Sequence, residues 1–243
     1  MSDFSEHIPL FTLQDEVLLR LQAIADPQLD LAKLCGGTAL ARCWLAHRVS
    51  YDLDFFFKQG FSAGKLAVNL KMQGIEFEAK EIVDDPYRAN QLHGTVMHAG
   101  QRLKVSFVED AYFELFPVVV KTFGSTTVRT ESALGLYHRK LRTVCGQGMQ
   151  GDSFEGGRQT ARDLFDLHVL SQVVMPLRPF MQSLPYAFPT AAFDNGLANM
   201  PWFDLMDELA ELVCAEKWEQ AKDITFLQNA LYGQIGASIV GDF

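Results

Sequence analysis

Residues 31–57 constrain the fold more than any other segment, because four short patterns follow one another there. The apolar run 31–35 predicts a strand, and Gly36-Gly37-Thr38 predicts a tight turn. Residues 39–47 have helical character, and residues 51–57 are strongly strand-forming. A strand, a glycine turn, a helix and a second strand in such close succession predict a mixed α/β sheet near the start of the chain.

The remaining sequence divides into a strand-rich first half and a helical second half. Ahead of the segment, residues 11–25 predict a helix with Thr12 as its N-cap. From Glu131 onward, apolar residues recur at helical spacing. We therefore expect an α+β fold, with a mixed-sheet domain over residues 1–125 and a helical domain over residues 126–243. The first half also contains a predicted helix and four β-forming runs, at 62–72, 76–83, 92–98, 103–108 and 118–123.

Composition excludes several classes of protein. The 243 residues include 21 Lys+Arg and 30 Asp+Glu, a net charge of −9, and 48% are hydrophobic, which is typical of a soluble globular chain. No apolar run approaches the roughly 18 residues of a membrane helix, and no secretory signal is visible, so we expect a cytoplasmic protein without a membrane anchor. The four cysteines lack metal-binding spacing. The acidic total means that a polyanion would need a local basic cluster.

Asp52 and Asp54 are the first candidates for chemistry. On a strand, residues two apart point to the same face, so these carboxylates would lie about 7 Å apart along the backbone. Such a pair repels unless a divalent cation lies between its members, and Mg²⁺ takes hard oxygen ligands of this kind while it also binds phosphates. The glycine turn at residues 36–38 would supply backbone N–H groups at a helix start, which bind phosphate.

Each part also has an ordinary structural interpretation. Gly-Gly-Thr is commonly a strand-to-helix turn with Thr38 as N-cap. Asp-x-Asp also occurs on solvated edge strands, and as a metal motif it is shared with glycosyltransferases and phosphatases. The run Phe55-Phe56-Phe57 directly after Asp54 favours a buried strand whose acidic end reaches a cleft.

Two blocks of sequence resemble a known family. Gly36-Gly37-Thr38-Ala39-Leu40, followed by residues 47–56 (His-Arg-Val-Ser-Tyr-Asp-Leu-Asp-Phe-Phe), is similar to the signature of the AbiEii/AbiGii toxin family of nucleotidyltransferases, a branch of the polymerase-beta-like superfamily. Lys140-Leu141, followed after the glycine-rich segment 146–157 by Arg158 and residues 162–170, is similar to that family's later lysine and its R-D-L-x-D-L helix. We expect segment 146–157 to be a mobile loop.

The resemblance implies a nucleotidyltransferase-like sheet domain and transfer of a nucleoside monophosphate from a nucleoside triphosphate to an acceptor hydroxyl, with release of pyrophosphate. Asp52 and Asp54 would hold Mg²⁺. Gly36, Gly37 and Thr38 would cradle the outer phosphates and Ser50 would add a hydroxyl contact. Arg48 and Lys140 would neutralise phosphate charge; the alternatives are a surface salt bridge for Arg48 and a solvated helix flank for Lys140.

The helical block leaves two alternatives open. Arg162 precedes Asp166 by four residues, and Asp163 and Asp166 are three apart, so these side chains could form ion pairs within one helix. Alternatively, Asp163 or Asp166 orients Lys140 or Arg158 toward the nucleotide, which would make this helix part of the nucleotide-binding site.

The sequence departs from the family pattern at one position. The family typically has a third carboxylate in a segment resembling residues 102–107, and the matching position here is Ser106. A serine hydroxyl is a poor metal ligand and a poor base. Three interpretations follow: a one-metal enzyme, an enzyme that uses a displaced carboxylate such as Asp110, Glu109 or Glu78, or a nucleotide-binding relative with little catalysis.

These observations favour three functions. The first is a Mg²⁺-dependent nucleotidyltransferase that is the toxin of an abortive-infection toxin–antitoxin pair, with RNA, plausibly tRNA, as acceptor. The second is a catalytically degenerate nucleotide-binding protein whose partner is an antitoxin. The third is a sugar-nucleotide transferase, which the Arg-Asp-Leu block does not predict. A local phosphate track for RNA would consist of His138, Arg139, Lys140, Arg142 and Arg158.

Overall fold

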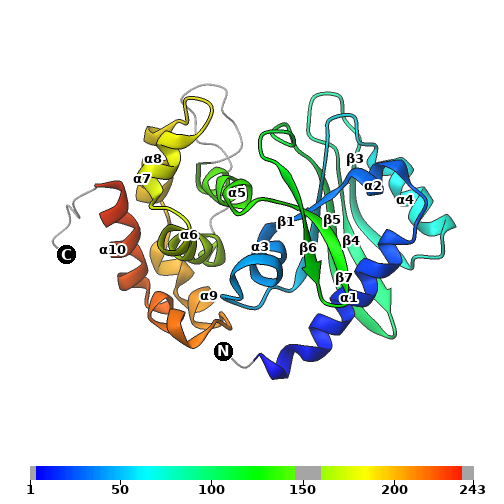
Figure 1. Cartoon of the computed structure of the whole chain (residues 1–243), viewed down its shortest axis with the longest axis horizontal. Coiled ribbons are helices and arrows are strands. Elements are labelled where there is room, and N and C mark those ends of the chain that lie inside the picture. The colour runs from blue at the N-terminus through cyan, green and yellow to red at the C-terminus, as the bar shows by residue number, and fades with distance from the viewer. Residues whose placement is uncertain (1–3, 146–159, 237–243) are drawn as a thin grey trace. The chain divides into compact units, whose positions relative to one another are not determined.

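The structure, a computed structural model, describes residues 4–145 and 160–236 (Figure 1). The described chain divides into two compact units, one ending at Leu136 and the other beginning at Tyr137. The first unit is a sheet with helices and the second is helical, so the expected α+β fold is confirmed. The expected mobile loop at residues 146–157 lies outside the described residues.

One mixed sheet organises the first unit, and its described strands follow the order β3-β4-β5-β2-β1-β7-β6. β2 lies near the centre, antiparallel to β1 and parallel to β5. The hairpin β6-β7 joins the sheet because β7 pairs in parallel with β1. The strands are β1 Lys33–Cys35, β2 Asp52–Phe57, β3 Phe77–Val83, β4 Gln91–His98, β5 Gln101–Glu109, β6 Val118–Phe123 and β7 Thr126–Glu131.

The alternation of side chains along β2 defines the two faces of the sheet. Leu53, Phe55 and Phe57 are buried on one face, where Phe55 stacks on Phe107 of β5 with ring centroids 5.5 Å apart. Asp52 and Asp54 lie on the other face and are partly exposed. The strand therefore anchors itself through its apolar face and presents its carboxylates on the opposite, polar face.

Two helices cover the apolar face of the sheet. α1 (Ile8–Gln22) packs against β4 and β5 and buries Leu13, Val17, Leu18 and Leu21. α4 (Ala63–Met72) begins at Ser62, whose hydroxyl accepts the N–H of Lys65 as an N-cap. The short helix α2 (Pro27–Leu31) begins at Asp26, whose carboxylate accepts two backbone N–H groups of its first turn.

The glycine turn joins β1 to a short helix. α3 (Gly36–Ala39) continues into a π-helical segment, Leu40–Leu45, which ends at Ala46 in the left-handed conformation. Gly36 has φ +72°, a conformation that glycine adopts without strain. The turn therefore depends on glycine at this position.

The second unit is built around α6, which is buried along most of its length. Tyr137 of α5 stacks on Phe180 of α7 with ring centroids 4.1 Å apart and donates its hydroxyl to the carbonyl of Met175. The helices are α5 Ala133–Cys145, α6 Ala161–Val173, α7 Leu177–Ser183, α8 Thr190–Ala198, α9 Met206–Ala210 and α10 Ile224–Ile235, with 3₁₀ turns at Trp202–Leu205 and Glu216–Lys222.

Several local expectations differ from the structure. The first helix starts at Ile8, with Pro9 in its first turn, so Thr12 lies inside it and is not the N-cap. Strand β7 was not expected at all, because Thr126–Glu131 lacks a clear apolar alternation. Since β7 pairs with β1, the sheet unit extends to Leu136 rather than to residue 125.

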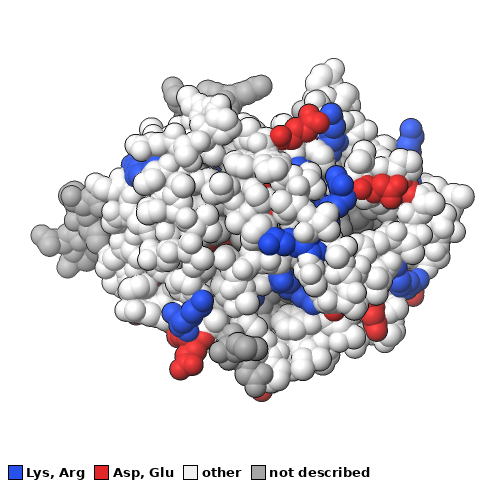
Figure 2. All heavy atoms as spheres, viewed as in Figure 1, with Lys and Arg blue, Asp and Glu red and all other residues white. Residues whose placement is uncertain are grey.

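Charged side chains are spread over the surface. Figure 2 shows one face of the molecule, on which basic and acidic side chains are interspersed among uncharged ones. Among residues 4–145 and 160–236, no helix combines the length and the apolar character needed to cross a bilayer.

Candidate functional site

The carboxylate of Asp54 lies directly against the glycine turn. A Cβ atom added to Gly36 would come within 2.6 Å of Asp54 Oδ2, a distance that real Cβ atoms do not tolerate. The register explains this approach, because Cys35 at the end of β1 pairs with Asp54 on β2. Glycine is therefore required at position 36 both by its positive φ and by the nearby carboxylate.

Gly37 likewise allows the backbone of the turn to lie close to a charged side chain, the guanidinium of Arg48. A Cβ on Gly37 would lie 2.5 Å from Arg48 Nη2 and 2.9 Å from Ser50 Oγ. Arg48 is buried and its Nη1 donates to the carbonyl of Val49 at 2.9 Å. The surface salt bridge considered for Arg48 is therefore wrong, and the guanidinium and the Ser50 hydroxyl both border the turn.

Two hydrogen bonds fix the segment that connects these groups. Thr38 donates its hydroxyl to the backbone carbonyl of Asp52, so Thr38 links the helix start to β2 and does not cap the helix. Gln14 of α1 donates from Nε2 to the carbonyl of Ser50 at 2.8 Å. The turn, Ser50 and the start of β2 are thus held together by buried contacts within the sheet unit.

The donor set of this site fits a magnesium ion that is shared with a phosphate. Asp52 and Asp54 provide hard oxygen atoms on one face of β2, beside a glycine turn whose backbone lies close to the Asp54 carboxylate. Within the described residues, no group of three or more His, Cys, Asp or Glu side chains has metal-binding geometry. Mg²⁺ commonly takes one or two carboxylates and completes its shell with water and phosphate, so two carboxylates suffice for this fit.

Ser106 occupies the position beside Asp54 on the neighbouring strand. The two residues are direct partners in the parallel pairing of β2 and β5, and Ser106 is buried. Two of the displaced carboxylates considered above are engaged elsewhere: Glu109 accepts the N–H groups of Gly60 and Asn90, and Glu78 pairs with Arg102 at 2.7 Å. Asp110 follows the end of β5, and its Oδ1 accepts the N–H of Tyr112.

The polar face also contains residues that the sequence did not single out. Lys104 is the direct partner of Asp52, and His93 of β4 is the direct partner of Ser106. Lys33 of β1, the direct partner of Phe56 on β2, is buried and lies 3.4 Å from the carboxylate of Glu131. The alternation of side chains within one strand cannot identify these residues. They reach the polar face through the pairing of strands that are distant in sequence.

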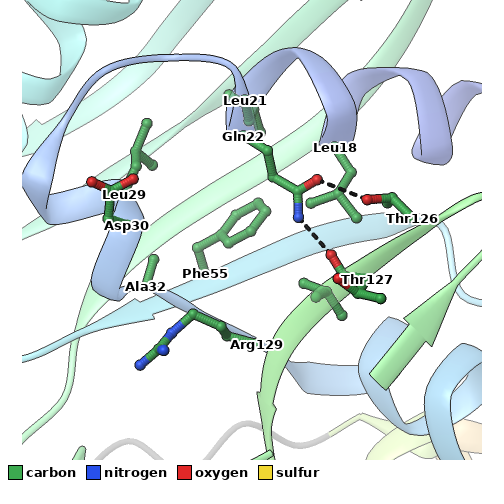
Figure 3. Close-up of a pocket in the computed structure, with 11 residues that line it drawn as sticks. Leu18, Leu21, Gln22, Leu29, Asp30, Ala32, Phe55, Thr126, Thr127 and Arg129 are labelled. Atoms are coloured by element: carbon green, nitrogen blue, oxygen red, sulfur yellow. Dashed lines mark hydrogen bonds between the residues drawn. The ribbon is translucent and has the colours of Figure 1, made fainter. Parts of the chain in front are cut away.

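One hollow in the sheet unit lies away from this polar face. Figure 3 shows a pocket of about 340 Å³ between α1, α2 and the strands, lined by Phe55 from the apolar face of β2. Gln22 closes one side of it by donating to the carbonyl of Thr127 at 2.7 Å and by accepting from the hydroxyl of Thr126. The volume of this pocket does not by itself identify a ligand.

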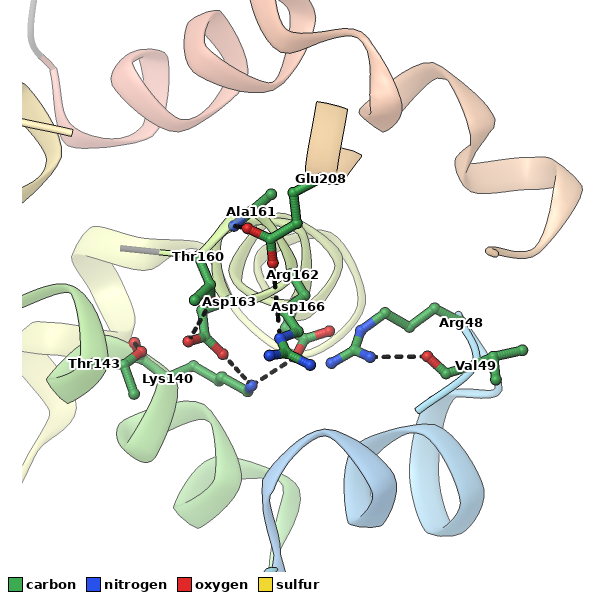
Figure 4. A network of polar contacts seen from close by, with 10 residues as sticks. All are labelled: Arg48, Val49, Lys140, Thr143, Thr160, Ala161, Arg162, Asp163, Asp166 and Glu208. Atoms are coloured by element: carbon green, nitrogen blue, oxygen red, sulfur yellow. Dashed lines mark hydrogen bonds and ion pairs between the residues drawn. The ribbon is translucent and has the colours of Figure 1, made fainter. Parts of the chain in front are cut away.

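In the helical unit, Lys140 is held between two carboxylates. Its Nζ lies 2.5 Å from Asp163 Oδ1 and 2.8 Å from Asp166 Oδ2, and all three side chains are at most 5% exposed (Figure 4). Thr160 donates its hydroxyl to Asp163 at 2.8 Å. Asp163 and Asp166 therefore both pair with Lys140, and the alternative that one of them orients Lys140 toward a nucleotide stays a prediction.

The geometry also corrects two expectations about basic residues. Lys140 is not a solvated helix flank, and His138 and Arg139 are buried as well, so these three residues do not form an exposed phosphate track. Arg162 lies closest to Glu208, with Nε 3.8 Å from Oε1. Arg158 lies outside the described residues.

Burial disfavours the thiolate form of three cysteines. It raises the pKa of Cys43 to about 11 and the pKa values of Cys145 and Cys214 to about 12. These three thiols therefore stay protonated at neutral pH.

Comparison with family models decides the family. Residues 18–224 match the model described as nucleotidyl transferase AbiEii toxin, Type IV TA system. The chain belongs to this family. The matched range includes the glycine turn, the Asp52–Asp54 strand and the Lys140 cluster. Both polar sites described above therefore lie in the part of the chain that the AbiEii model covers.

A solved structure of low sequence identity agrees with the fold of this chain. A Helicobacter pylori protein named as a candidate nucleotidyltransferase aligns with TM-score 0.54 and 17% identity over 94% of both chains. JHP933 from Helicobacter pylori aligns with TM-score 0.48 and 18% identity over 93% of this chain and 90% of the other. An antigenic nucleotidyltransferase-like protein from Paracoccidioides brasiliensis aligns with TM-score 0.47 and 15% identity over 78% and 86%. No curated protein matches the chain.

Proposed function

We propose that this chain is a Mg²⁺-dependent nucleotidyltransferase that transfers a nucleoside monophosphate from a nucleoside triphosphate to an acceptor hydroxyl. The observation that carries the proposal is the contact between Gly36 and the Asp54 carboxylate, which brings a phosphate-binding turn and an acidic metal site together. The family membership supports the same reaction class.

The residues of the sheet unit have complementary roles in this proposal. Asp52 and Asp54 would hold Mg²⁺, which neutralises phosphate charge and orients the triphosphate when it is bound. Gly36, Gly37 and the helix start would bind the outer phosphates through backbone N–H groups. Arg48 and Ser50 border the same turn and would donate to the phosphate oxygens.

Lys140, Asp163 and Asp166 remain proposed nucleotide-binding residues of the helical unit. Because both carboxylates contact the ammonium, its role would be to present one remaining N–H to a phosphate. Arg158 is proposed on the family resemblance alone.

The family membership motivates our proposals for the acceptor and the biological role. We propose RNA, plausibly tRNA, as acceptor, an antitoxin protein as partner, and action as an abortive-infection toxin in the cytoplasm. With a net charge of −9, RNA binding would depend on local cations such as Lys104 on the polar face.

A second candidate function rests on Ser106. A serine in register with Asp54 removes one negative charge from the site, which favours a nucleotide-binding protein with little catalysis.

The test is incubation of the full chain with each α-³²P-labelled nucleoside triphosphate, total RNA, and Mg²⁺ or Mn²⁺. We expect label in RNA, equimolar pyrophosphate, and loss of both in Asp54→Asn. Nucleotide binding without label transfer under either metal would support the second candidate. Release of nucleoside diphosphate instead of pyrophosphate would indicate a sugar-nucleotide transferase and would contradict the proposal.

A further inference from the structure

Three neighbouring strands place Asp54, Ser106 and His93 in one row across the polar face. Asp54 is paired with Ser106, and Ser106 is paired with His93 on β4. Directly paired residues point to the same face, and neighbouring strands lie about 4.8 Å apart. The small side chain of Ser106, which is buried, therefore separates a carboxylate on one side from an imidazole on the other.

The imidazole of His93 is held in one orientation. Its Nε2 lies 2.8 Å from Oε1 of Gln91, which is two residues earlier on the same face of β4. Because the amide oxygen only accepts hydrogen bonds, this contact places the proton on Nε2 and leaves the lone pair on Nδ1. His93 is thus a partly exposed neutral base with a defined tautomer.

Charged groups on both adjacent strands face this imidazole. Partial burial and Lys104 on β5 lower the pKa of His93 from its usual 6.5, and Glu81, its partner on β3, opposes this effect. Asp54 lies one strand beyond Ser106. The net result favours the uncharged ring at neutral pH.

We infer that His93 is the general base of the transfer reaction and replaces the carboxylate that Ser106 lacks. Nδ1 accepts the proton of the acceptor hydroxyl as its oxygen bonds to the α-phosphorus, while the bond to the bridging oxygen breaks and pyrophosphate leaves. The inference rests on the proposed nucleotidyltransferase function, and it adds the residue that activates the acceptor.

The first test compares His93→Gln with His98→Gln. Both histidines are on β4, but His98 contacts Arg20 and Glu16 of α1 on the apolar side and serves as a matched control. We expect His93→Gln to lower the transfer rate by about a hundredfold or more, with nucleotide affinity unchanged, and His98→Gln to keep the wild-type rate. A wild-type rate in His93→Gln, with Asp54→Asn inactive, would overturn this inference and leave the proposed function intact.

The second test restores the carboxylate. In Ser106→Asp, His93 should become dispensable, so His93→Gln/Ser106→Asp should transfer at least tenfold faster than His93→Gln. If Ser106→Asp binds Mn²⁺ by electron paramagnetic resonance and the double variant is as slow as His93→Gln, a carboxylate cannot take over from the imidazole and the inference fails.

The third test does not depend on turnover. The His93 ring resonances of the free protein, assigned with His93→Gln, should titrate below pH 6.5, and Lys104→Gln should raise that midpoint because it removes a cation. The transfer rate should fall as the pH drops through the same midpoint. A midpoint above 7 in the wild type would exclude a neutral base and overturn the inference.

Discussion

The two polar sites of this protein differ in the exposure and surroundings of their paired carboxylates. On β2, Asp52 and Asp54 remain partly exposed, and a glycine turn lies against one of them. In the helical unit, Asp163 and Asp166 are fully buried and both contact Lys140. The first pair is open to solvent on the polar face, while the second is buried around the ammonium group of Lys140.

This difference in burial indicates which acidic pair is suited to bind a metal. Buried carboxylates without a partner cost several kcal/mol, so Asp163 and Asp166 need Lys140 for the stability of their own unit. Asp52 and Asp54 tolerate their mutual repulsion because solvent reaches them. We therefore expect substitutions at β2 to affect activity and substitutions in the helical cluster to affect stability first.

The largest effect is expected at Asp54. Asp54→Asn should lower transfer on the order of a thousandfold, because the site loses one of two proposed metal ligands, while the unfolding midpoint changes little. Transfer assays and urea denaturation measure the two effects, and Asp30→Asn, an exposed acid near the Figure 3 pocket, is the control. Equal transfer rates in Asp54→Asn and Asp30→Asn would contradict the assignment of Asp54 as a metal ligand.

Lys140→Met should destabilise the protein by about 3–5 kcal/mol, because it leaves two buried carboxylates without their cation. Lys222→Met, which removes a partly exposed ion pair with Glu219, should cost less than about 1 kcal/mol. Urea denaturation followed by circular dichroism compares them. The triple variant Lys140→Met/Asp163→Asn/Asp166→Asn should recover part of the lost free energy of unfolding. A stable but inactive Lys140→Met would instead make this cluster mainly catalytic.

Gly36→Ala separates backbone strain from the contact with Asp54. Gly36 and Gly74 have φ +72° and +73°, but a Cβ on Gly74 meets nothing within 4 Å. Both alanine variants should lose about 1–2 kcal/mol, and only Gly36→Ala should also reduce transfer, by at least about tenfold, because the carboxylate must move. Equal transfer in the two variants would show that the contact is unimportant.

The smallest effect is a pH dependence in the helical unit. Burial against Trp218 and Phe226 lowers the pKa of His168, so the unfolded chain binds a proton more readily than the folded one. The free energy of unfolding should therefore fall as the pH decreases from 7.5 to 5.5. Thermal denaturation should show this slope reduced in His168→Phe, and an identical slope would contradict the assignment.

Much of the fold could be predicted from local patterns. The strand-forming run at residues 51–57 predicted β2, and helical spacing after Glu131 predicted the helical second half. Strand β7 could not be predicted, since its pairing with β1 involves residues about a hundred positions away in sequence. The sheet therefore extends past the expected domain boundary.

The candidate site was predictable only in part. Asp52, Asp54, Gly36 and Gly37 come from two neighbouring segments, so their spacing and the family resemblance identified them. Lys104 and His93 were missed because only the pairing of β2, β5 and β4 brings them to the polar face.

By itself, the sequence determined the α+β class, the family and the acidic strand beside a glycine turn, because these features depend on residue types at short spacing. The tertiary structure alone decided which of the acidic pairs is buried around a lysine and which histidine faces Ser106. Those properties depend on strand register and burial, and both are set by packing between segments that are distant in the chain.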